Sequence, residues 1–353
     1  MSKRRVLSLV CIGLFLWVGT LAFGAEDQSK LIEGAKKEGK VVYWAAGLTP
    51  DLAKAIEAGF KKRNGLPPNF EVLFVPSVTA ETVSKATQEI KYKRVTVDIL
   101  CGGMPEFFYD LKRAGELMRY DSPEYKFFPP VKGVSSEPGY WVATNALSPV
   151  IMWNPKFVKK NITSYNDLLD PEFKGMICSA DPKKSESYLG DYMGLRKVLS
   201  KEFLMKLAKQ GPIVWLTRGP DVLNKVVTGE RPITFMGNNR NAYVASLEGA
   251  SIKVCFPKEG ITVRANNWPI LAKAPHPNAA KLLIDYVHSE EGQRLIAEMS
   301  GYFIGRKGVP IPPKVREFTP PLTDINIIPM DWTTMTDADM KRARKEFIEI
   351  FGE

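Results

Sequence analysis

Residues 41–51 read Val41-Val42-Tyr43-Trp44-Ala45-Ala46-Gly47-Leu48-Thr49-Pro50-Asp51. The run opens with four apolar residues of strand character, and the small residues after them indicate a turn. The last three residues suit the start of a helix: threonine is a good N-cap, proline fits the first turn, and aspartate complements the positive end of the helix dipole. Apolar residues then recur at helical spacing, at Leu52, Ile56 and Phe60, and Gly65 ends the helix. The stretch predicts a strand, a turn and a helix.

The same unit is repeated twice further along the chain. Residues 71–75 and 97–101 are predicted strands. Thr79 can cap a helix that runs to about Tyr92, and Gly102-Gly103-Met104-Pro105 leads into a third helix. Strand, turn and helix in this order are typical of a parallel sheet covered by helices.

A second series follows two neighbouring extended runs, residues 139–143 and 150–153. Its predicted strands are residues 174–178, 213–216, 233–236 and 252–256. Helices are expected after Ser185 and Ser187, after Arg218-Gly219, and as one long helix over residues 278–297. We interpret residues 145–262 as a second α/β domain.

The amino-terminal segment is predicted to be a secretory signal peptide. Lys3, Arg4 and Arg5 precede an uncharged, mostly apolar run over residues 6–21, and Ala22-Phe23-Gly24 offers small residues for cleavage. The alternative is a transmembrane anchor, but about 16 apolar residues fall short of the roughly 20 that span a bilayer. We therefore expect residues 1–24 to be removed and the mature protein to be exported and soluble.

The composition excludes several classes of protein. The 353 residues are 44% hydrophobic and 25% charged, which is ordinary for a globular protein and too polar for one that spans a membrane many times. The net charge of +10 is spread over short clusters such as Lys61-Lys62-Arg63. Because these clusters form no nucleic-acid-binding signature, we expect no nucleic acid partner.

The cysteines and histidines are few. Four cysteines and two histidines leave little material for a zinc site or a disulfide scaffold. Cys101, Cys178 and Cys255 remain after export, each at or near the end of a predicted strand, and we expect buried thiols. A Cys178–Cys255 disulfide stays open as an alternative in an oxidising compartment.

The repeated turns between strands and helices point to a binding cleft. In open α/β sheets, ligands bind beyond the carboxyl ends of the strands, where helix N-termini expose unpaired N–H groups and partial positive charge. Two such domains facing one another would line a cleft with several helix N-termini. This geometry favours a small solute that is anionic or carries a carboxylate.

Several segments together resemble a known family. They are Gly39-Lys40-Val41-Val42-Tyr43, residues 97–100 with Gly102-Gly103, residues 167–175, Ala180-Asp181-Pro182, residues 226–230, residues 289–293 and residues 327–332. In order and spacing they resemble the extracellular solute-binding proteins of bacterial ABC importers, most closely family 1, the iron-type branch with the type II periplasmic-binding fold. The resemblance covers about residues 30–350.

The resemblance implies a two-domain Venus-flytrap with mixed, mostly parallel sheets flanked by helices. Domain 1 would comprise residues 25–144 and 263–321, and domain 2 would comprise residues 145–262 and 322–353. The chain would cross between them near residues 141–147 and 259–266. Such a protein is a periplasmic monomer that captures a small solute and delivers it to ABC permease subunits at the inner membrane, without cofactor and without catalysis.

Departures from the iron-type pattern argue against a direct metal site. Ferric binders typically carry a histidine after the first strand, a carboxylate after the third and two adjacent tyrosines in the second domain. Here the loop after the first strand is Ala45-Ala46-Gly47-Leu48, without a histidine, and the loop after the third strand is Gly102-Gly103-Met104, without a carboxylate. Arg240-Asn241 aligns with the tyrosine pair. An arginine cannot ligate Fe³⁺, which needs hard oxygen ligands, but its planar fork suits a carboxylate or a phosphate.

The candidate ligand-binding residues follow from these turns and from the resemblance. They are Trp44, Gly47, Thr79, Gly102, Gly103, Ser185, Ser187, Arg218, Gly219, Asn239, Arg240 and Tyr243. For most of them a structural role is the alternative: a salt bridge for Arg240, surface exposure for Arg218, helix capping for the two serines, and core packing for Trp44 and Tyr243.

Other functions remain as alternatives. One is a binding protein of the same family for ferric ion or a ferric chelate, and another is a ligand-sensing protein that docks on a membrane receptor. A third is an exported enzyme with Cys101 as nucleophile, displayed at the carboxyl end of a strand. Neither His276 nor His288 is placed by the sequence as its activating base.

Overall fold

The computed structural model describes residues 28–331 and 334–352. The predicted signal peptide, residues 1–24, lies outside the described residues. Within these ranges, no helix is both long enough and apolar enough to span a bilayer.

The first three predicted units form a parallel sheet. Strands β1 (Lys40–Ala46), β2 (Glu71–Ser77) and β3 (Ile99–Cys101) pair in the order β2-β1-β3. Helices α2 (Pro50–Asn64), α3 (Thr79–Lys91) and α4 (Pro105–Arg113) follow the strands in turn. Thr49 Oγ1 accepts the Leu52 N–H at 3.3 Å, and Gly65 ends α2 in the left-handed conformation. The predicted sheet, Thr49 cap and Gly65 stop are confirmed.

Thr79 does not cap its helix, contrary to the prediction. The extended N-cap position belongs to Val78, and Thr79 is the first helical residue. Its hydroxyl therefore cannot make the N-cap hydrogen bond to the first turn. The start of α3 has no side-chain cap among the residues that the structure describes.

The second series forms a mixed sheet of five strands. Strands β5 (Pro149–Trp153), β6 (Ile177–Ala180), β7 (Val214–Leu216), β8 (Ile233–Asn238) and β9 (Lys253–Cys255) pair in the order β7-β6-β8-β5-β9. Strand β6 is parallel to β7 and β8, whereas β5 is antiparallel to β8 and β9. The associated helices are α5 (Glu186–Leu195), α6 (Lys201–Ala208), α7 (Gly219–Thr228) and α8 (Asn239–Leu247).

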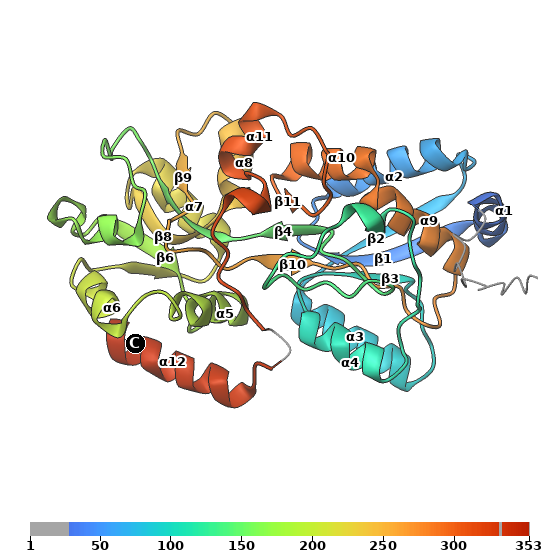
Figure 1. The fold of residues 1–353 in the computed structure, drawn as a ribbon, viewed down its shortest axis with the longest axis horizontal. Coiled ribbons are helices and arrows are strands. Elements are labelled where there is room, and N and C mark those ends of the chain that lie inside the picture. Colours follow the sequence, from blue (N-terminus) through green and yellow to red (C-terminus); the bar gives the residue numbers. More distant parts are fainter. Residues whose placement is uncertain (1–27, 332–333, 353) are drawn as a thin grey trace, which may run out of the picture.

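A small antiparallel sheet lies between the two larger ones (Figure 1). Strand β4 (Asn145–Leu147) pairs with β10 (Arg264–Asn266) on one side and with β11 (Phe303–Ile304) on the other. Residues 139–143, which were predicted to be extended, do not form a strand. Only an isolated bridge between Trp141 and Glu137 is formed there. The strand begins instead at Asn145, inside one of the segments expected to cross between domains.

The single long helix predicted over residues 278–297 is two helices. Helix α9 (Pro277–His288) ends at Ser289, whose extended backbone begins α10 (Glu290–Ser300) and whose Oγ accepts the Gly292 N–H at 3.2 Å. A β-carbon at Gly292 would lie 2.2 Å from the Tyr286 carbonyl oxygen. The apolar spacing runs through both helices, so it hid a junction that is set by one cap and one close approach.

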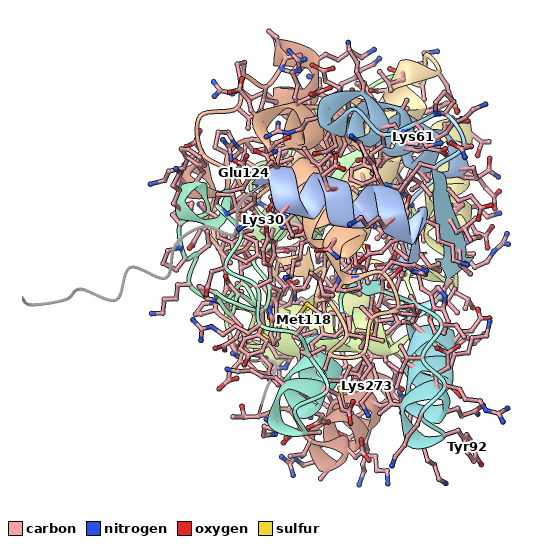
Figure 2. All side chains as sticks on the ribbon, turned by 90° about the vertical axis from the view of Figure 1, so that its right-hand side faces the viewer. Lys30, Lys61, Tyr92, Met118, Glu124 and Lys273 are labelled. Atoms are coloured by element: carbon pink, nitrogen blue, oxygen red, sulfur yellow. The ribbon has the colours of Figure 1, made fainter. Side chains whose placement is uncertain are left out.

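Each larger sheet has its own core. Around β1, apolar residues of α1 (Gln28–Glu38), α2 and α9 pack with Tyr43 and Trp268, which are both fully buried. Figure 2 shows this end of the molecule, where Lys61 and Tyr92 lie on the outside. Around β5, β6 and β8, the core includes Tyr165, Tyr192 and Phe347. Cys101, Cys178 and Cys255 are buried free thiols, as expected, so the alternative disulfide is not formed.

The carboxyl-terminal segment completes the second core. After α11 (Pro313–Phe318), the chain forms a bridge from Ile327 to Ile261 and then α12 (Asp337–Phe351), which packs on α5 and α6. Phe347 is fully buried, with its ring 5.2 Å from Tyr192 and 4.8 Å from Trp215 between centroids. The tail is thereby packed against the helices and the edge strand β7 of the second sheet.

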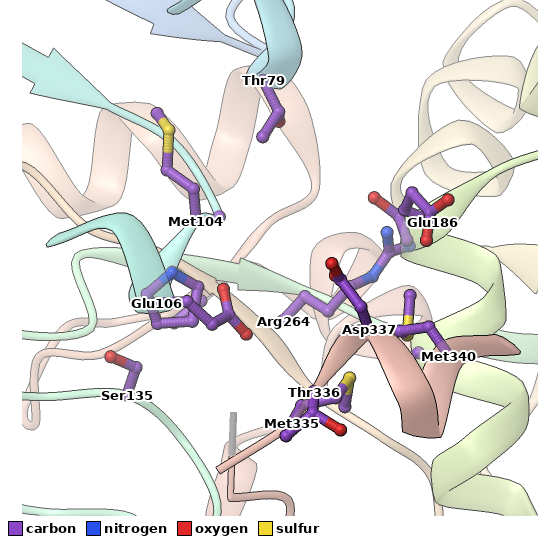
Figure 3. Close-up of a pocket in the computed structure, with 15 residues that line it drawn as sticks. Thr79, Met104, Glu106, Ser135, Glu186, Arg264, Met335, Thr336, Asp337 and Met340 are labelled. Atoms are coloured by element: carbon purple, nitrogen blue, oxygen red, sulfur yellow. The ribbon is translucent and has the colours of Figure 1, made fainter. Parts of the chain in front are cut away.

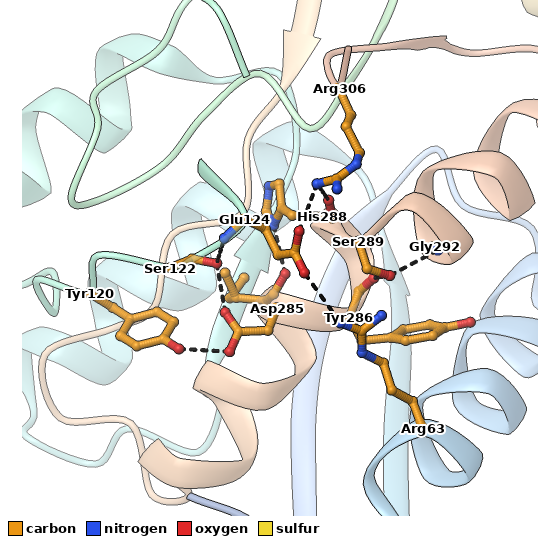
Figure 4. Close-up of polar contacts among 11 residues, drawn as sticks. Arg63, Tyr120, Ser122, Glu124, Asp285, Tyr286, His288, Ser289, Gly292 and Arg306 are labelled. Carbon is orange, nitrogen blue, oxygen red and sulfur yellow. Dashed lines mark hydrogen bonds and ion pairs between the residues drawn. The ribbon is translucent and has the colours of Figure 1, made fainter. Parts of the chain in front are cut away.

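A polar network fixes α9 to residues 120–124 (Figure 4). The Asp285 carboxylate accepts hydrogen bonds from Tyr120 Oη at 2.8 Å and from Ser122 Oγ at 2.6 Å. Three residues on, the buried His288 ring contacts Thr144 Oγ1 at 2.8 Å and the Ile284 carbonyl at 2.7 Å. Burial raises the pKa of Asp285 to about 6 and lowers the pKa of His288 to about 4.

Candidate functional site

A cavity of about 360 Å³ is lined by residues that precede or begin four helices and by strand β10 (Figure 3). Thr79, Met104 and Glu106 lie on one side, Glu186, Asp337 and Met340 lie on the other, and Arg264 lies between them. The full lining is Thr79, Gly103, Met104, Pro105, Glu106, Ser135, Glu186, Ser187, Gly190, Arg264, Ala265, Met335, Thr336, Asp337 and Met340. Both larger sheets therefore contribute helices to one cavity.

The four helix starts differ in how their N–H groups are satisfied. Ser185 Oγ accepts from the Tyr188 N–H in α5, and Thr336 and Asp339 form a reciprocal capping box in α12. At α3 and α4, by contrast, Val78 and Met104 occupy the N-cap, and within the described ranges neither helix has a side-chain cap. The first turns of α3 and α4 therefore present backbone donors and the positive end of the dipole toward the cavity.

Arg264 is the basic side chain among the described residues that line the cavity. Its Nη2 lies 3.2 Å from Oδ2 of Asp191, and its guanidinium lies 5.4 Å from the centroid of the Tyr188 ring. Asp191 is fully buried, and its Oδ1 also accepts a hydrogen bond from Thr262 Oγ1 at 2.7 Å. Burial raises the pKa of Asp191, and the charge of Arg264 opposes that rise.

Three carboxyl groups line the same cavity. Burial raises the pKa of Glu106 in the first turn of α4, and nearby Asp110 adds to the rise. Glu186 begins α5 and pairs with Arg344 of α12 at 2.6 Å, and Asp337 begins α12. Acidic residues in a first turn complement the helix dipole, so these groups balance part of the positive potential of the helix starts.

Three of the predicted ligand residues, Thr79, Gly103 and Ser187, line the cavity. Gly102 directly precedes Gly103 and exchanges backbone hydrogen bonds with Asn267, which joins the β3–α4 turn to the segment after β10. A β-carbon at Gly103 would lie 3.3 Å from the Ala265 carbonyl oxygen. This close approach explains why glycine suits the turn.

Six other predicted residues have contacts outside the cavity lining. Trp44 is buried in the core beside α4, with Lys85 Nζ 6.0 Å from its ring centroid. The Tyr243 hydroxyl donates to the Glu298 carbonyl at 2.6 Å, and Asn239 Oδ1 accepts from the Ser148 N–H at 3.0 Å. Arg218 is exposed and pairs with Asp221, next to Gly219, whose position lies close to Tyr188 and Asn241. Ser185 serves as the α5 cap described above.

Arg240 and Gly47 meet at Tyr302 rather than at the cavity. The Arg240 guanidinium lies 5.1 Å from the centroid of the Tyr302 ring, and the Tyr302 hydroxyl donates to the Gly47 carbonyl at 2.9 Å. Arg240 is thus stacked on an aromatic ring. The arginine that lines the cavity is Arg264, which the sequence reasoning did not select.

The sequence held signals for some of the residues that were missed. Arg264 lies within residues 259–266, one of the two segments expected to cross between domains. Thr336 and Asp339 have capping-box spacing, which marks the start of α12. Glu106 follows Pro105 in the predicted third helix, but its position in a cavity needed the tertiary fold.

The structure does not favour Cys101 and His276 as catalytic groups, and it shows no cluster of metal ligands among the described residues. Cys101 is buried, and burial raises the pKa of its thiol well above the ordinary value, which opposes a thiolate nucleophile. His276 contacts the buried Asp98 through Nδ1 at 2.9 Å. Among the described residues, no three side chains of histidine, cysteine, aspartate or glutamate come together as a metal site.

Comparison with known protein families identifies the family of this chain. Residues 55–318 match the sequence model described as a bacterial extracellular solute-binding protein, which covers well over half of the chain. The chain belongs to this solute-binding family. The recognised family and the two-lobed α/β fold agree with the expectation from the sequence.

A curated relative matches part of this solute-binding protein. A curated spermidine/putrescine-binding periplasmic protein of Escherichia coli is 26% identical over 151 residues, or 40% of this chain and 42% of that protein. The alignment thus spans less than half of that relative's length.

Solved structures share the fold of this solute-binding protein at low identity. AfuA from Actinobacillus pleuropneumoniae, with exogenous fructose-6-phosphate bound, has a TM-score of 0.68 and 18% identity, and the match covers 88% of this chain and 98% of AfuA. Iron-bound HitA from Pseudomonas aeruginosa has a TM-score of 0.67 and 21% identity, and the match covers 88% and 99%. One of these proteins holds a sugar phosphate and the other holds iron, so the shared fold does not fix the ligand.

Proposed function

We propose that this protein is the periplasmic solute-binding component of an ABC importer. After its signal peptide is removed, the monomer binds a small solute in the cavity and delivers it to permease subunits at the inner membrane, without chemistry of its own. The family assignment supports this role. The cavity supports it too, because it is lined from both of the larger sheets, as a cleft that closes on a solute requires.

The proposed movement uses the small central sheet. Domain 1 comprises residues 25–144 and 263–321, domain 2 comprises residues 145–262 and 322–353, and the chain crosses between them through β4 and β10. Differential affinity of the solute for the closed form then shifts the population toward closure. The short strands β4 and β10, of three residues each, suit segments that bend.

The solute is proposed to carry an anionic group. The observation that supports this most is Arg264, whose guanidinium lines the cavity beside the uncapped starts of α3 and α4. A guanidinium recognises carboxylate and phosphate through paired N–H donors, and helix starts add backbone donors and positive potential. Thr79, Gly103 and Ser187 complete the proposed anion site.

The test is a binding screen on Arg264→Gln. Protein stripped of co-purified solute would be screened by thermal shift against fructose 6-phosphate, phosphonates, inorganic oxyanions, dicarboxylates, amino acids, and citrate with and without Fe³⁺. A solute at 100 times its Kd adds about 2.7 kcal/mol to the free energy of unfolding. Loss of Arg264 is expected to weaken the binding of an anionic solute by about 2–3 kcal/mol, which is on the order of 30- to 150-fold in Kd. Calorimetry measures this change.

Arg218→Gln is the matched control, because Arg218 is exposed and paired on the surface. It should leave the affinity unchanged. An anionic solute that binds equally well to Arg264→Gln would contradict the proposed anion site, and a shift with bare Fe³⁺ alone would favour the ferric-ion alternative.

A second candidate is a cationic solute of the polyamine type. The carboxyl groups of Glu106, Glu186 and Asp337 line the cavity, and a partial relative binds spermidine and putrescine. The same screen therefore includes both polyamines. Binding of a polyamine that is lost in Glu106→Gln and kept in Arg264→Gln would select this candidate over the first.

A further inference from the structure

We propose that Asp191, buried beneath Arg264, is a specificity-determining residue that restricts the cavity to singly charged anionic groups. The inference rests on the proposed function, in which Arg264 receives the anionic group of the solute. Asp191 would act through Arg264 and is therefore a positioning residue for it.

The first step of the argument is the geometry of the pair. Asp191 is fully buried in α5, and its Oδ2 lies 3.2 Å from Arg264 Nη2. The side chain of Arg264 keeps 19% of its surface exposed, whereas Asp191 has none. Asp191 therefore stands behind the guanidinium, and the solute meets the other side of Arg264.

The second step is the orientation of Arg264. Thr262 Oγ1 donates to Asp191 Oδ1 at 2.7 Å, so the carboxylate is fixed to the same segment that carries Arg264. The ring of Tyr188 lies 5.4 Å from the guanidinium. The ion pair with Asp191 and the ring of Tyr188 together restrict the positions that the guanidinium can take at the cavity.

The third step is charge. The positive charge of Arg264 is already matched by Asp191, and Glu106, Glu186 and Asp337 are the other charged side chains among the described residues of the lining. One negative charge on the solute can be met by the guanidinium donors and the starts of α3 and α4. A second negative charge meets no additional cationic side chain of the described lining and is repelled by its carboxylates.

The experiment compares two tetrahedral oxyanions of different charge, methanesulfonate with one and sulfate with two. Their affinities would be measured by NMR titration for the full-length mature protein and for Asp191→Asn. Removing the buried carboxylate leaves Arg264 uncompensated, so the affinity ratio of sulfate to methanesulfonate is expected to rise about tenfold. A residue with only a structural role would weaken both anions equally and leave this ratio unchanged, and that result would overturn the inference.

Thr262→Val is the matched control. It removes the hydroxyl that donates to the same carboxylate but keeps both charges, so the ratio should stay at the wild-type value. If Asp191→Asn does not fold, Asp191→Ser replaces it, because this variant also removes the buried charge and keeps Arg264. The same rise in the ratio is expected, and an unchanged ratio would overturn the inference.

The failure of the proposed function would look different. Wild-type protein that binds neither anion would overturn both the proposal that the solute is anionic and this inference. Wild-type protein that binds an anion through Arg264, but whose charge preference ignores Asp191, would overturn the inference alone.

Discussion

Phe347→Ala is expected to lower the free energy of unfolding by about 3–5 kcal/mol. The side chain is fully buried, and its ring lies within 5.2 Å of Tyr192, 4.8 Å of Trp215 and 4.9 Å of Phe351 between centroids. Truncation removes the apolar burial and leaves a cavity that rigid aromatic neighbours fill poorly. Urea unfolding followed by circular dichroism measures the change.

The same variant should weaken solute binding. Phe347 anchors α12, whose first turn contributes Asp337 and Met340 to the cavity. Phe157→Ala is the control, since that phenylalanine is 53% exposed and its loss should cost about 1 kcal/mol or less. A Phe347→Ala protein as stable as the control would mean that α12 is not held by this aromatic cluster.

The second large effect is a pH dependence that appears in Asp285→Asn. The buried His288 has a pKa of about 4 against an ordinary 6.5, so the unfolded chain binds its proton first as the pH falls. His288 therefore removes about 3 kcal/mol from the free energy of unfolding between pH 6.5 and 4. Asp285, raised from 3.8 to about 6, binds its proton first in the folded state and adds about 3 kcal/mol over nearly the same range.

In the wild type these two contributions oppose each other on one helix. Asp285→Asn removes the compensation, and its free energy of unfolding should fall by about 3 kcal/mol more than that of the wild type between pH 6.5 and 4. His288→Gln should show the opposite, with stability that rises on acidification. Chemical unfolding at a series of pH values measures both slopes, with the exposed Asp121→Asn as control. Parallel curves for the wild type and Asp285→Asn would contradict the assignment.

Much of the fold could be predicted because residues close together in the sequence determine it. Thr49 caps the start of α2 and Gly65 caps its end, and runs of apolar residues mark the strands of both larger sheets. The break between α9 and α10 at Ser289 was not predicted, because the apolar spacing of α9 continues into α10. In the sequence, nothing distinguishes a capping serine from any other serine on a helix. Local periodicity reports which face is buried and not where a helix is interrupted.

The residues that line the cavity were predicted less well, for a tertiary reason. Arg240 and Arg264 are both arginines next to cleft-forming segments, and nothing local separates them. What separates them is that Tyr302 stands under Arg240, while Asp191 and Tyr188 hold Arg264 at the cavity. Those neighbours lie far away in the sequence, so the choice between the two arginines needed the assembled fold.

The core around β1 also bears on the order in which the chain matures. Its members come from two distant parts of the sequence, with Leu31 and Tyr43 packed among residues such as Trp268, Leu283 and Tyr286. A nascent chain therefore cannot close this core until α9 has been synthesised, however early β1 and α2 emerge. Contacts so distant along the chain make folding slow. Slow folding suits the export that we propose, because a precursor that stays extended can be threaded through a secretion channel.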